Sequence, residues 1–201
     1  MNMKKTIGII GGMGPLATAD LFRKIVTMTD AKCDQEHPRV LIDSNTNIPD
    51  RTAAILTGGE NPLPQLAASA RTLERAGADV LMMPCNTAHY FYDGVCAATK
   101  LPVLHMLRLT AEEIDRRKIK TVGLLATDGT IRTGIYERLF GEHGVAVVKP
   151  DAAGQKQIMA LIYDGVKAGN AAFDTTPVRA VLDAMLALGV EAFVLGCTEL
   201  P

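Results

Sequence analysis

The sequence predicts an α/β protein that consists of two similar lobes, each built on a doubly wound parallel sheet. Short runs of aliphatic and β-branched residues alternate along the chain with longer amphipathic segments, which is typical of strands and helices that alternate in a parallel sheet. The alternation starts again near residue 120. At 201 residues and 48% hydrophobic composition, the chain has enough apolar material to bury a core in each lobe.

The first half begins with a buried strand and a tight loop, Gly11-Gly12-Met13-Gly14. Pro15 favours the first turn of the helix that follows, because its missing N–H is not needed there. Gly77 is expected to end a later helix, since glycine readily adopts the left-handed conformation of a C-cap. In this half we expect strands at 6–10, 40–43, 80–83 and 103–106, and helices at 15–29, at 64–76, from about 86, and at 110–118.

The second half repeats the pattern, and no linker rich in proline, serine or charge separates it from the first half. We place the boundary after residue 102, which gives a first lobe at 1–102 and a second lobe at 103–201. The elements expected in the remainder are strands at 121–126, 145–148 and 192–195 and helices at 132–143, 155–167 and 177–188.

Two pairs of segments indicate that the lobes are repeats of one design. The sequence KTIGII at residues 5–10 resembles KTVGLL at 120–125, an offset of 115. The sequence GADVLMMPC at 77–85 resembles GVEAFVLGC at 189–197, an offset of 112. Because both pairs have nearly the same offset, we expect the two lobes to be pseudo-symmetric. The alternative is a chance likeness between buried strands.

Composition excludes several classes of protein. The net charge is −1 and tryptophan is absent, so neither nucleic acid nor an anionic membrane is an expected partner. No apolar run approaches the roughly 18–20 residues of a membrane span, and the N-terminus lacks the apolar region of a signal peptide. The four cysteines contain no CxxC pair, so we expect a reducing, cytoplasmic location and no metal site.

Cys85 and Cys197 occupy the same place in the two repeats. Each follows a buried strand at the point where a helix is expected to begin, which in a parallel sheet is the edge where ligands bind. A helix N-terminus lowers the pKa of a thiol and attracts carboxylates. Cysteine is more commonly a small buried residue, and we keep that interpretation for Cys33 and Cys96.

Two facing thiols suit one type of reaction. Inversion of a carbon stereocentre requires removal of a proton from one face and return of a proton to the other. A thiolate on one side and a thiol on the other do this without a cofactor, and they exchange roles with the direction of the reaction.

Four motifs in order give the chain a specific resemblance: IIGGMGP at 9–15, SNTNIPDRT at 44–52, PCNTAH at 84–89 and GCTEL at 196–200. Together they resemble the aspartate/glutamate racemase family, which are amino-acid racemases independent of pyridoxal phosphate. The resemblance covers essentially the whole chain. It implies racemisation of aspartate, glutamate or both, no cofactor, an active site in the cleft between the lobes, and a homodimer. Family members continue with a helix that returns to the first lobe, and we expect this chain to lack that helix.

The resemblance also implies roles for individual residues. Cys85 and Cys197 look like the paired catalytic acid and base, and Asp50 and Glu199 are candidates for helping proton transfer. The substrate-binding positions that it implies are Met13, Arg51, Asn86, Thr87, Thr127, Lys167 and Thr198.

Within this set, Asn86, Thr87 and Thr198 are expected to hold the α-carboxylate, with Thr127 as a further polar contact. Arg51 and Lys167 are expected to receive a side-chain carboxylate, and Met13 is expected to line the pocket.

Each binding role has a structural alternative. Arg51 could form a structural salt bridge, and Lys167 could be a solvated cation at a helix end. Asn86 and Thr87 could be helix caps, which does not exclude binding. Thr127 could belong to a turn, and Met13 could be plain loop packing.

Two other functions stay open at this point. One is an NAD(P)-binding oxidoreductase: Gly12-Met13-Gly14-Pro15 begins a formal match to the dinucleotide-binding pattern, although Pro15 lacks the N–H that a pyrophosphate would need. Asp43 also follows Gly12 by about 30 residues rather than the usual ~20. A binding protein without catalysis would share the two lobes but would not need two thiols. His89, four residues after Cys85, either tunes that thiol or lies on a helix surface.

Overall fold

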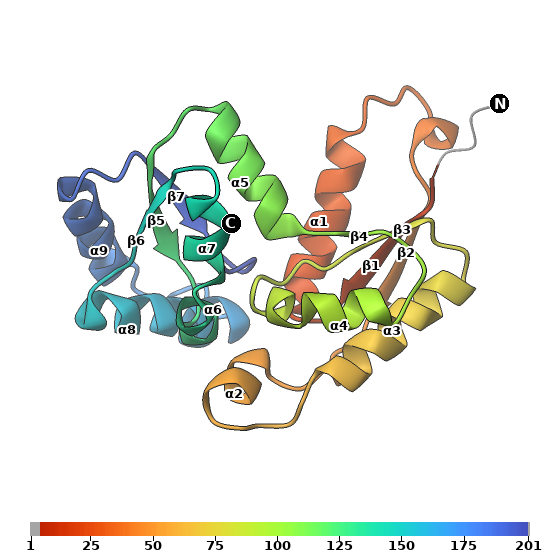
Figure 1. The fold of residues 1–201 in the computed structure, drawn as a ribbon, viewed down its shortest axis with the longest axis horizontal. Helices are drawn as coiled ribbons and strands as arrows, with labels where there is room; N and C mark the ends of the chain where they lie inside the picture. Colours follow the sequence, from red (N-terminus) through yellow and green to blue (C-terminus); the bar gives the residue numbers. More distant parts are fainter. Residues whose placement is uncertain (1–4, 201) are drawn as a thin grey trace. The chain divides into compact units, whose positions relative to one another are not determined.

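The structure is a computed structural model that describes residues 5–200. The chain divides into two compact units, residues 1–106 and 107–201 (Figure 1). The first unit extends four residues beyond the boundary suggested by the sequence, because Val103–Leu104 pairs with the strand Val80–Met82 of the first sheet. The alternation of strands and helices is as expected, and the protein has the predicted α/β class.

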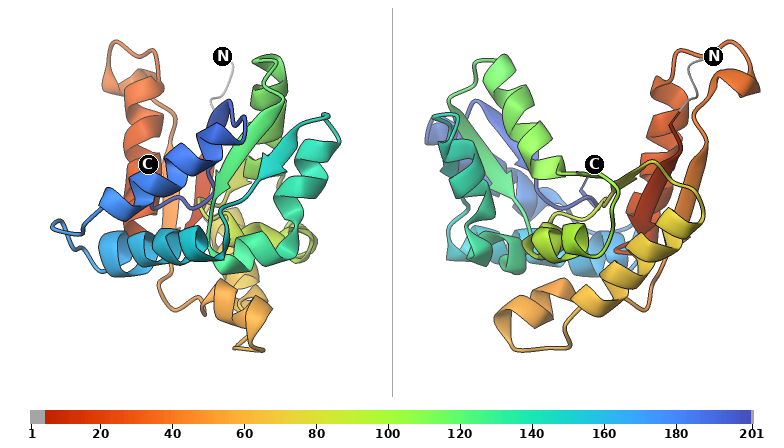
Figure 2. Two further views of the ribbon diagram at one scale, coloured as in Figure 1. Left: turned by 90° about the vertical axis from the view of Figure 1, so that its left-hand side faces the viewer. Right: turned by 45° about the vertical axis from the view of Figure 1, so that its right-hand side comes forward.

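The first unit contains a parallel sheet of four strands in the order β2-β1-β3-β4. The helices that connect β1 to β2 and β2 to β3 lie on opposite faces of the sheet (Figures 1 and 2), as right-handed crossovers require. The strands are β1 (Ile7–Gly11), β2 (Val40–Ser44), β3 (Val80–Met82) and β4 (Val103–Leu104), and the long helices are α1 (Pro15–Met28) and α3 (Leu63–Arg75).

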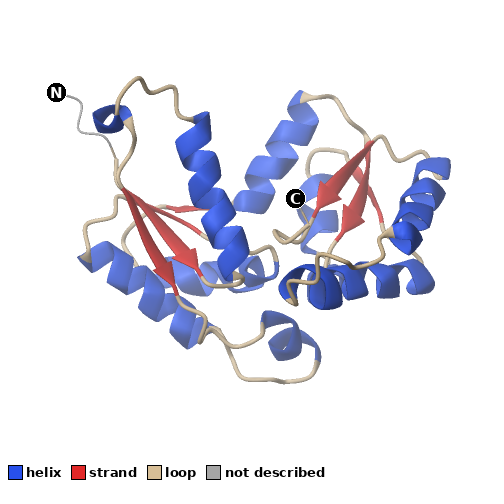
Figure 3. Ribbon diagram, turned by 180° about the vertical axis from the view of Figure 1, so that it is seen from behind, coloured by secondary structure: helices blue, strands red, loops and turns tan. Residues whose placement is uncertain are grey.

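The second unit repeats the central part of this arrangement with a parallel sheet in the order β6-β5-β7. The strands are β5 (Thr121–Leu125), β6 (Ala146–Val148) and β7 (Ala192–Leu195). The helices are α5 (Met106–Arg116), α6 (Asp128–Thr133), α7 (Ile135–Gly141), α8 (Ala152–Ala160) and α9 (Thr176–Ala187). Figure 3 shows helices on both faces of each set of strands.

Equivalent residues make the same contacts in the two units, which confirms the predicted repeat. In the first unit, the Thr6 N–H donates to the Asp79 carboxylate at 2.6 Å, and the Asp79 N–H donates to the Thr6 carbonyl at 2.8 Å. In the second unit, the Thr121 N–H donates to the Glu191 carboxylate at 2.8 Å, and the Glu191 N–H donates to the Thr121 carbonyl at 2.9 Å. Each acidic residue therefore fixes the start of the strand at the centre of its own sheet.

The structure differs from the expected elements where local chemistry interrupts a helix or a strand. The strand expected at 103–106 ends at Leu104, since Met106 already begins α5. The helix expected at 132–143 is broken at Gly134, which has a φ of +61°. The helix expected from 86 begins as a 3-10 helix, and the one at 155–167 becomes a π-helix. These segments are η2 (Thr87–Phe91) before α4 (Tyr92–Ala97), and η3 (Leu161–Lys167) after α8.

Two short helices were not expected from the sequence: η1 (Asp34–Glu36) and α2 (Arg51–Leu56). Helix α2 has a clear start signal, because Asp50 caps it by accepting the Ala53 N–H at 2.7 Å. With only 6 residues, it is too short to show helical periodicity, which becomes readable over about 11 residues or more.

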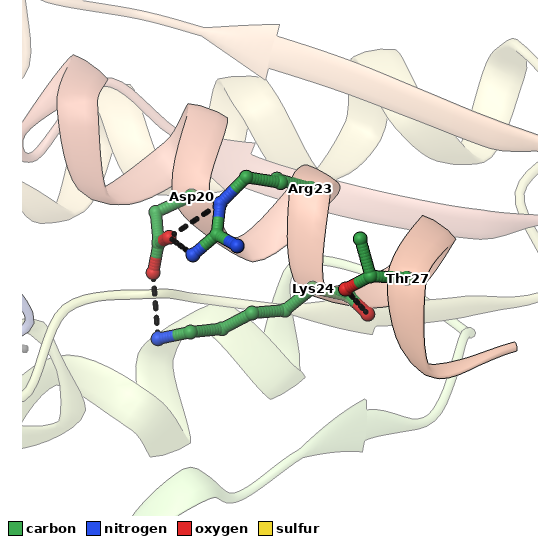
Figure 4. Close-up of polar contacts among 4 residues, drawn as sticks. All are labelled: Asp20, Arg23, Lys24 and Thr27. Atoms are coloured by element: carbon green, nitrogen blue, oxygen red, sulfur yellow. Dashed lines mark hydrogen bonds and ion pairs between the residues drawn. The ribbon is translucent and has the colours of Figure 1, made fainter.

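Helix α1 carries a compact ion-pair cluster (Figure 4). Asp20 pairs with Arg23 and also with Lys24, whose Nζ lies 2.6 Å from Oδ2. Hydrogen bonds from Lys24 and then Arg23 lower the pKa of Asp20. Solvent-exposed pairs of this kind contribute little to stability. None of the helices in residues 5–200 has the length and apolar character to cross a membrane.

Gly12→Ala is expected to lower the free energy of unfolding by about 2 kcal/mol. Gly12 has a φ of +89°, and a Cβ there would lie 2.4 Å from the Asn45 carbonyl carbon. Urea unfolding measures the loss. Gly58→Ala is the matched control in the same unit, because Gly58 has a φ of +68° but no atom within 4 Å of a built Cβ. It should lose only about 1 kcal/mol, and equal losses in the two variants would contradict the steric argument.

Candidate active site

Cys85 lies just beyond the carboxyl end of β3 and is only 5% exposed. It belongs to a buried cluster that includes Met13, from the loop after β1, and Ile48, from the segment after β2. All three strands are parallel, so these residues come from one edge of the first sheet. This is the edge at which α/β sheets bind ligands.

Asn86 and Thr87 follow Cys85 directly and are both buried. Thr87 is the first residue of η2, and the Asn86 carbonyl accepts the His89 N–H at 3.0 Å. The chain therefore turns tightly after the thiol, and the backbone of this turn is fixed by its own hydrogen bond.

Arg51 is a buried cation, with 8% of its surface exposed. Its Nη1 donates to the carbonyls of Ile48 at 3.1 Å and Pro49 at 2.9 Å, whereas its buried Nε has no hydrogen-bond partner. None of the ion pairs found in residues 5–200 involves it, so the structural salt bridge is not observed. A buried guanidinium with an unsatisfied N–H is suited to bind an anion.

Asp50 is exposed, whereas its neighbour Arg51 is buried. The Asp50 side chain caps α2 through the Ala53 N–H. Its observed contact is thus structural, since a cap residue satisfies a backbone donor at the start of a helix.

His89 is one of the most completely buried polar residues, with 2% exposure, so its placement on a helix surface is wrong. Its Nδ1 lies 2.8 Å from the Cys85 carbonyl, and its Nε2 accepts the Met106 N–H at 3.2 Å. Burial lowers the pKa of His89 to about 4; the Cys85 and Leu104 carbonyls oppose this shift, and His105 adds to it. The four-residue spacing from Cys85 was the one signal of this contact in the sequence.

Cys197 lies just beyond the carboxyl end of β7 in the second unit and is 9% exposed. A turn follows it, in which the Leu200 N–H donates to the Cys197 carbonyl at 3.0 Å. Within this turn Thr198 is half-buried and Glu199 is buried. The second thiol therefore has the same relation to its sheet as the first.

Tyr136 of α7 is a buried residue that the sequence did not indicate. Burial, and then the negative charge of a Cys197 thiolate, raise the pKa of Tyr136 above its usual range. Its ring packs edge-on against Phe140, with 5.2 Å between the centroids. Tyr136 therefore keeps its phenolic proton close to the second thiol.

Thr127 follows β5 and is buried at the start of α6. Its hydroxyl accepts the Thr130 N–H at 3.3 Å and lies 3.2 Å from the Thr130 hydroxyl. The observed contacts are those of a helix cap, which was the alternative to a binding role and does not exclude one.

Lys167 ends η3 with an exposed side chain, and its Nζ lies 4.6 Å from the centre of the Tyr163 ring. The face of an aromatic ring attracts a cation and restrains it. Tyr163 also lines a cavity of about 540 Å³ in the second unit, together with Asp128, Gln155 and Met159. Asp128, which lines the cavity, directly follows Thr127 in the chain.

Two backbone groups of the glycine-rich loop after β1, the Gly12 N–H and the Gly14 carbonyl, are hydrogen-bonded within the chain. The Gly12 N–H donates to the Thr18 hydroxyl at 2.9 Å, and that hydroxyl donates to the Gly14 carbonyl at 2.9 Å. Pro15 begins α1 and has no N–H to offer. A dinucleotide pyrophosphate needs free N–H groups at this position, so these contacts do not favour an oxidoreductase.

In residues 5–200, no cluster of three or more histidine, cysteine or acidic side chains has the arrangement to hold a metal ion. All four cysteines are free thiols.

A family model described as Asp/Glu/hydantoin racemase matches residues 10–201. The chain belongs to this racemase family. The match includes both thiols and the site positions discussed above, and a curated relative is an amino-acid racemase, which makes it an isomerase. The resemblance of the four sequence motifs is thus confirmed over nearly the whole chain.

Two solved structures and one curated protein are similar along almost all of this racemase. An aspartate racemase from Picrophilus torridus has 34% identity and a TM-score of 0.89, over 98% of this chain and 82% of that one. An aspartate racemase homologue from Pyrococcus horikoshii OT3 has 30% identity and a TM-score of 0.78, over 99% of this chain and 87% of that one. The broad specificity amino-acid racemase RacX of Bacillus subtilis (strain 168) is 27% identical, over 96% of this chain and 85% of that protein.

Proposed function

We propose that this racemase inverts an acidic amino acid, aspartate, glutamate or both, without a cofactor, and that Cys85 and Cys197 are its two proton-transfer groups. The observation that carries the proposal is the equivalent placement of two buried thiols. Each follows the carboxyl end of a strand that pairs with the central strand of its sheet, β3 with β1 and β7 with β5. Chance burial of cysteine does not explain why both repeats of a racemase have it there.

The proposed reaction is balanced by the two thiols alone. One cysteine, as thiolate, takes the proton from the α-carbon and becomes a thiol, while the carbon holds the electron pair as a carbanion. The other cysteine, as thiol, gives its proton to the opposite face and becomes a thiolate. The product is the mirror image of the substrate, and the enzyme is ready for the reverse direction.

The carbanion requires donors that stabilise negative charge, because an α-proton beside a carboxylate is very weakly acidic. We propose that Asn86, Thr87 and Thr198 hold the α-carboxylate and that Thr127 adds a polar contact. Met13 packs in the same buried cluster as Cys85, which supports a role in lining the pocket.

We further propose that Glu199 assists proton transfer at Cys197. Glu199 is buried and follows Cys197 by two residues. The exposed cap position of Asp50 gives that residue less support as a helper.

The preference for an acidic substrate is supported by Arg51. Its buried, unpartnered Nε and the absence of an ion pair in residues 5–200 leave a positive charge to be balanced, and a side-chain carboxylate would do so. Lys167 is a second candidate cation for the same group. The similar protein from Picrophilus torridus is itself an aspartate racemase.

The test is exchange of the α-proton in D₂O, followed by NMR for deuterium and by chiral chromatography for inversion. L- and D-aspartate and L- and D-glutamate are compared with asparagine, glutamine and alanine. Inversion of an acidic pair with deuterium incorporation is expected. Equal or faster inversion of the neutral amino acids would contradict the acidic preference, and binding without exchange would identify a non-catalytic binding protein.

Arg51→Gln is expected to raise KM for the acidic substrate roughly 10- to 100-fold, the value of one charge-assisted hydrogen bond. The KM for a neutral amino acid should change much less, because that substrate has no carboxylate for Arg51 to bind. Steady-state kinetics with both substrates measures the difference, with thermal melting to verify folding. Arg75→Gln, on the exposed end of α3, is the control, and a parallel loss with both substrates would contradict the assignment.

The same family relationship supports the proposal of a homodimer in the cytoplasm. The four free thiols of the protein are compatible with a reducing compartment. Light scattering of the purified protein tests the subunit number.

A further inference from the structure

The His89 imidazole connects the backbone at Cys85 to the end of the first unit. Its Nδ1 lies 2.8 Å from the Cys85 carbonyl oxygen, and the Met106 N–H points to its Nε2 at 3.2 Å. Met106 is the last residue of the first unit and the first residue of α5. Both contacts are to backbone atoms, so the ring fixes the main chain rather than another side chain.

The two contacts determine which ring nitrogen carries the proton. A backbone N–H can only donate, so Nε2 must be the acceptor for Met106. A carbonyl can only accept, so Nδ1 must carry the proton that it donates to Cys85. The ring is therefore neutral, in the Nδ1–H tautomer.

The direction of the Cys85 carbonyl has a consequence for the next residue. A peptide unit is planar and trans, so the carbonyl of Cys85 and the N–H of Asn86 lie in one plane and point in opposite directions. A hydrogen bond that fixes the carbonyl therefore also aims the Asn86 N–H. The same plane fixes the start of the 3-10 turn that follows the thiol.

We propose that His89 is a positioning residue of the racemase site: its Nδ1–H holds the Cys85–Asn86 peptide plane, and thereby orients the Cys85 thiol and the Asn86 amide toward the substrate. This inference rests on the proposed function, in which Cys85 transfers a proton and Asn86 binds the α-carboxylate. His89 itself does not touch the substrate and does not move a proton in the reaction.

The surroundings keep the imidazole neutral and its ring fixed. The titratable groups that face it are His105, with ring centroids 4.9 Å apart, and Tyr92, stacked at 6.1 Å. The Tyr92 hydroxyl donates to the Val103 carbonyl at 2.7 Å, which anchors that ring to β4. Burial outweighs the Cys85 and Leu104 carbonyls, which favour a charged ring, and no carboxylate is among the groups that shift the pKa of His89.

Two isosteric variants separate the two contacts. In His89→Asn the side-chain NH₂ takes the place of Nδ1 and retains the donation to Cys85. In His89→Gln the amide reaches the place of Nε2 and can accept only from Met106. His89→Phe fills the space and loses both hydrogen bonds. Tyr92→Phe is the control, because it removes a half-buried hydrogen bond from the same cluster, one that the Tyr92 hydroxyl donates to the Val103 carbonyl rather than to Cys85.

The readout is the rate of α-proton exchange in D₂O, measured separately for each enantiomer. The enantiomer served by Cys85 is the one whose exchange is lost in Cys85→Ala. For that enantiomer, His89→Phe and His89→Gln are expected to slow exchange roughly 10- to 100-fold, because small misplacement of a reacting group has effects of this size. Exchange of the other enantiomer should be much less affected, and His89→Asn should remain close to wild type.

Several outcomes would overturn the inference. Equal loss of exchange for both enantiomers, in proportion to a lower melting temperature, would show a merely structural role. If His89→Gln were as active as His89→Asn, the hydrogen bond to the Cys85 carbonyl would not be the one that activity requires.

A further readout does not depend on activity: the NMR shifts of the Cys85 carbonyl carbon and the Asn86 amide should move in His89→Phe and not in His89→Asn. Unchanged shifts in His89→Phe would refute the positioning role even in an inactive protein. Absence of exchange in the wild type, with the expected shifts, would instead refute the proposed function alone.

Discussion

Replacement of either Cys85 or Cys197 by alanine is expected to reduce net racemisation by at least ~10²- to 10⁴-fold, the usual contribution of a positioned acid or base. Each thiol serves one face of the α-carbon in the proposed reaction. With one thiol missing, a proton removed from one face cannot be replaced by a proton on the other. Chiral chromatography from each enantiomer measures the loss.

The two variants should differ in a way that a general loss of activity cannot imitate. Cys85→Ala retains Cys197, which can still remove and return the proton on its own face. One enantiomer should therefore exchange its α-proton with D₂O without inversion, and Cys197→Ala should show the opposite enantiomer doing so. Exchange of the same enantiomer in both variants would contradict the assignment of one thiol to each face.

Cys96→Ala is the matched control for loss of a thiol, since Cys96 is half-buried and packs against the same cluster as Cys85. It is expected to racemise like the wild type. If Cys96→Ala were as inactive as Cys85→Ala, the loss would come from packing rather than from chemistry.

The stability of the protein is expected to fall by about 3 kcal/mol between pH 6.5 and pH 4 because of His89 alone. The pKa of His89 is lowered to about 4 in the folded protein, from the ordinary value of 6.5 that an unfolded chain retains, with burial as the first cause. Above pH 6.5 the ring is neutral in both states and has no effect on the free energy of unfolding. As the pH falls toward 4, the unfolded chain takes up a proton that the folded protein does not, so unfolding becomes easier.

Urea unfolding at a series of pH values measures this slope, and His89→Phe should remove most of it. The variant is expected to be less stable than the wild type near pH 7, where it lacks two hydrogen bonds, and to approach the wild type at pH 4. His143→Asn controls for the loss of a histidine outside this cluster, since His143 lies 3.5 Å from Asp115 in the second unit. A His89→Phe curve parallel to that of the wild type would contradict the buried neutral imidazole.

Local sequence was sufficient to predict the repeat and the strands, apart from the end of the strand expected at 103–106. A buried parallel strand is a short apolar run bounded by turn residues, and this signal lies entirely within the run. Gly8 and Gly123 illustrate this at equivalent positions of KTIGII and KTVGLL. A Cβ would come within 2.6 Å of the Leu81 side chain in the first case and 2.7 Å of the Phe193 ring in the second. The repeat in the sequence thus corresponds to a repeat in the packing.

Helices were predicted less well where their ends depend on single residues or on tertiary contacts. Gly134 breaks one expected helix, and helix α2 is too short to produce a periodic pattern. The turn after Cys85 is a 3-10 helix rather than an α-helix. The sequence pattern could not distinguish a 3-10 helix from an α-helix at that turn, because the backbone hydrogen bonds of the two differ by only one residue in spacing.

The sequence by itself determined the fold class, the two repeats and the racemase family, since these depend on patterns that each segment carries alone. Only the tertiary structure decided that Arg51 is buried with an unsatisfied N–H, that His89 bonds to Cys85 and to Met106, and that Tyr136 lies near Cys197. The physical reason is distance along the chain: Met106 is 17 residues from His89, and Tyr136 is far from Cys197 in sequence. Contacts of this kind arise when the elements pack, and the burial that shifts a pKa or leaves an N–H unpaired exists only in the folded protein.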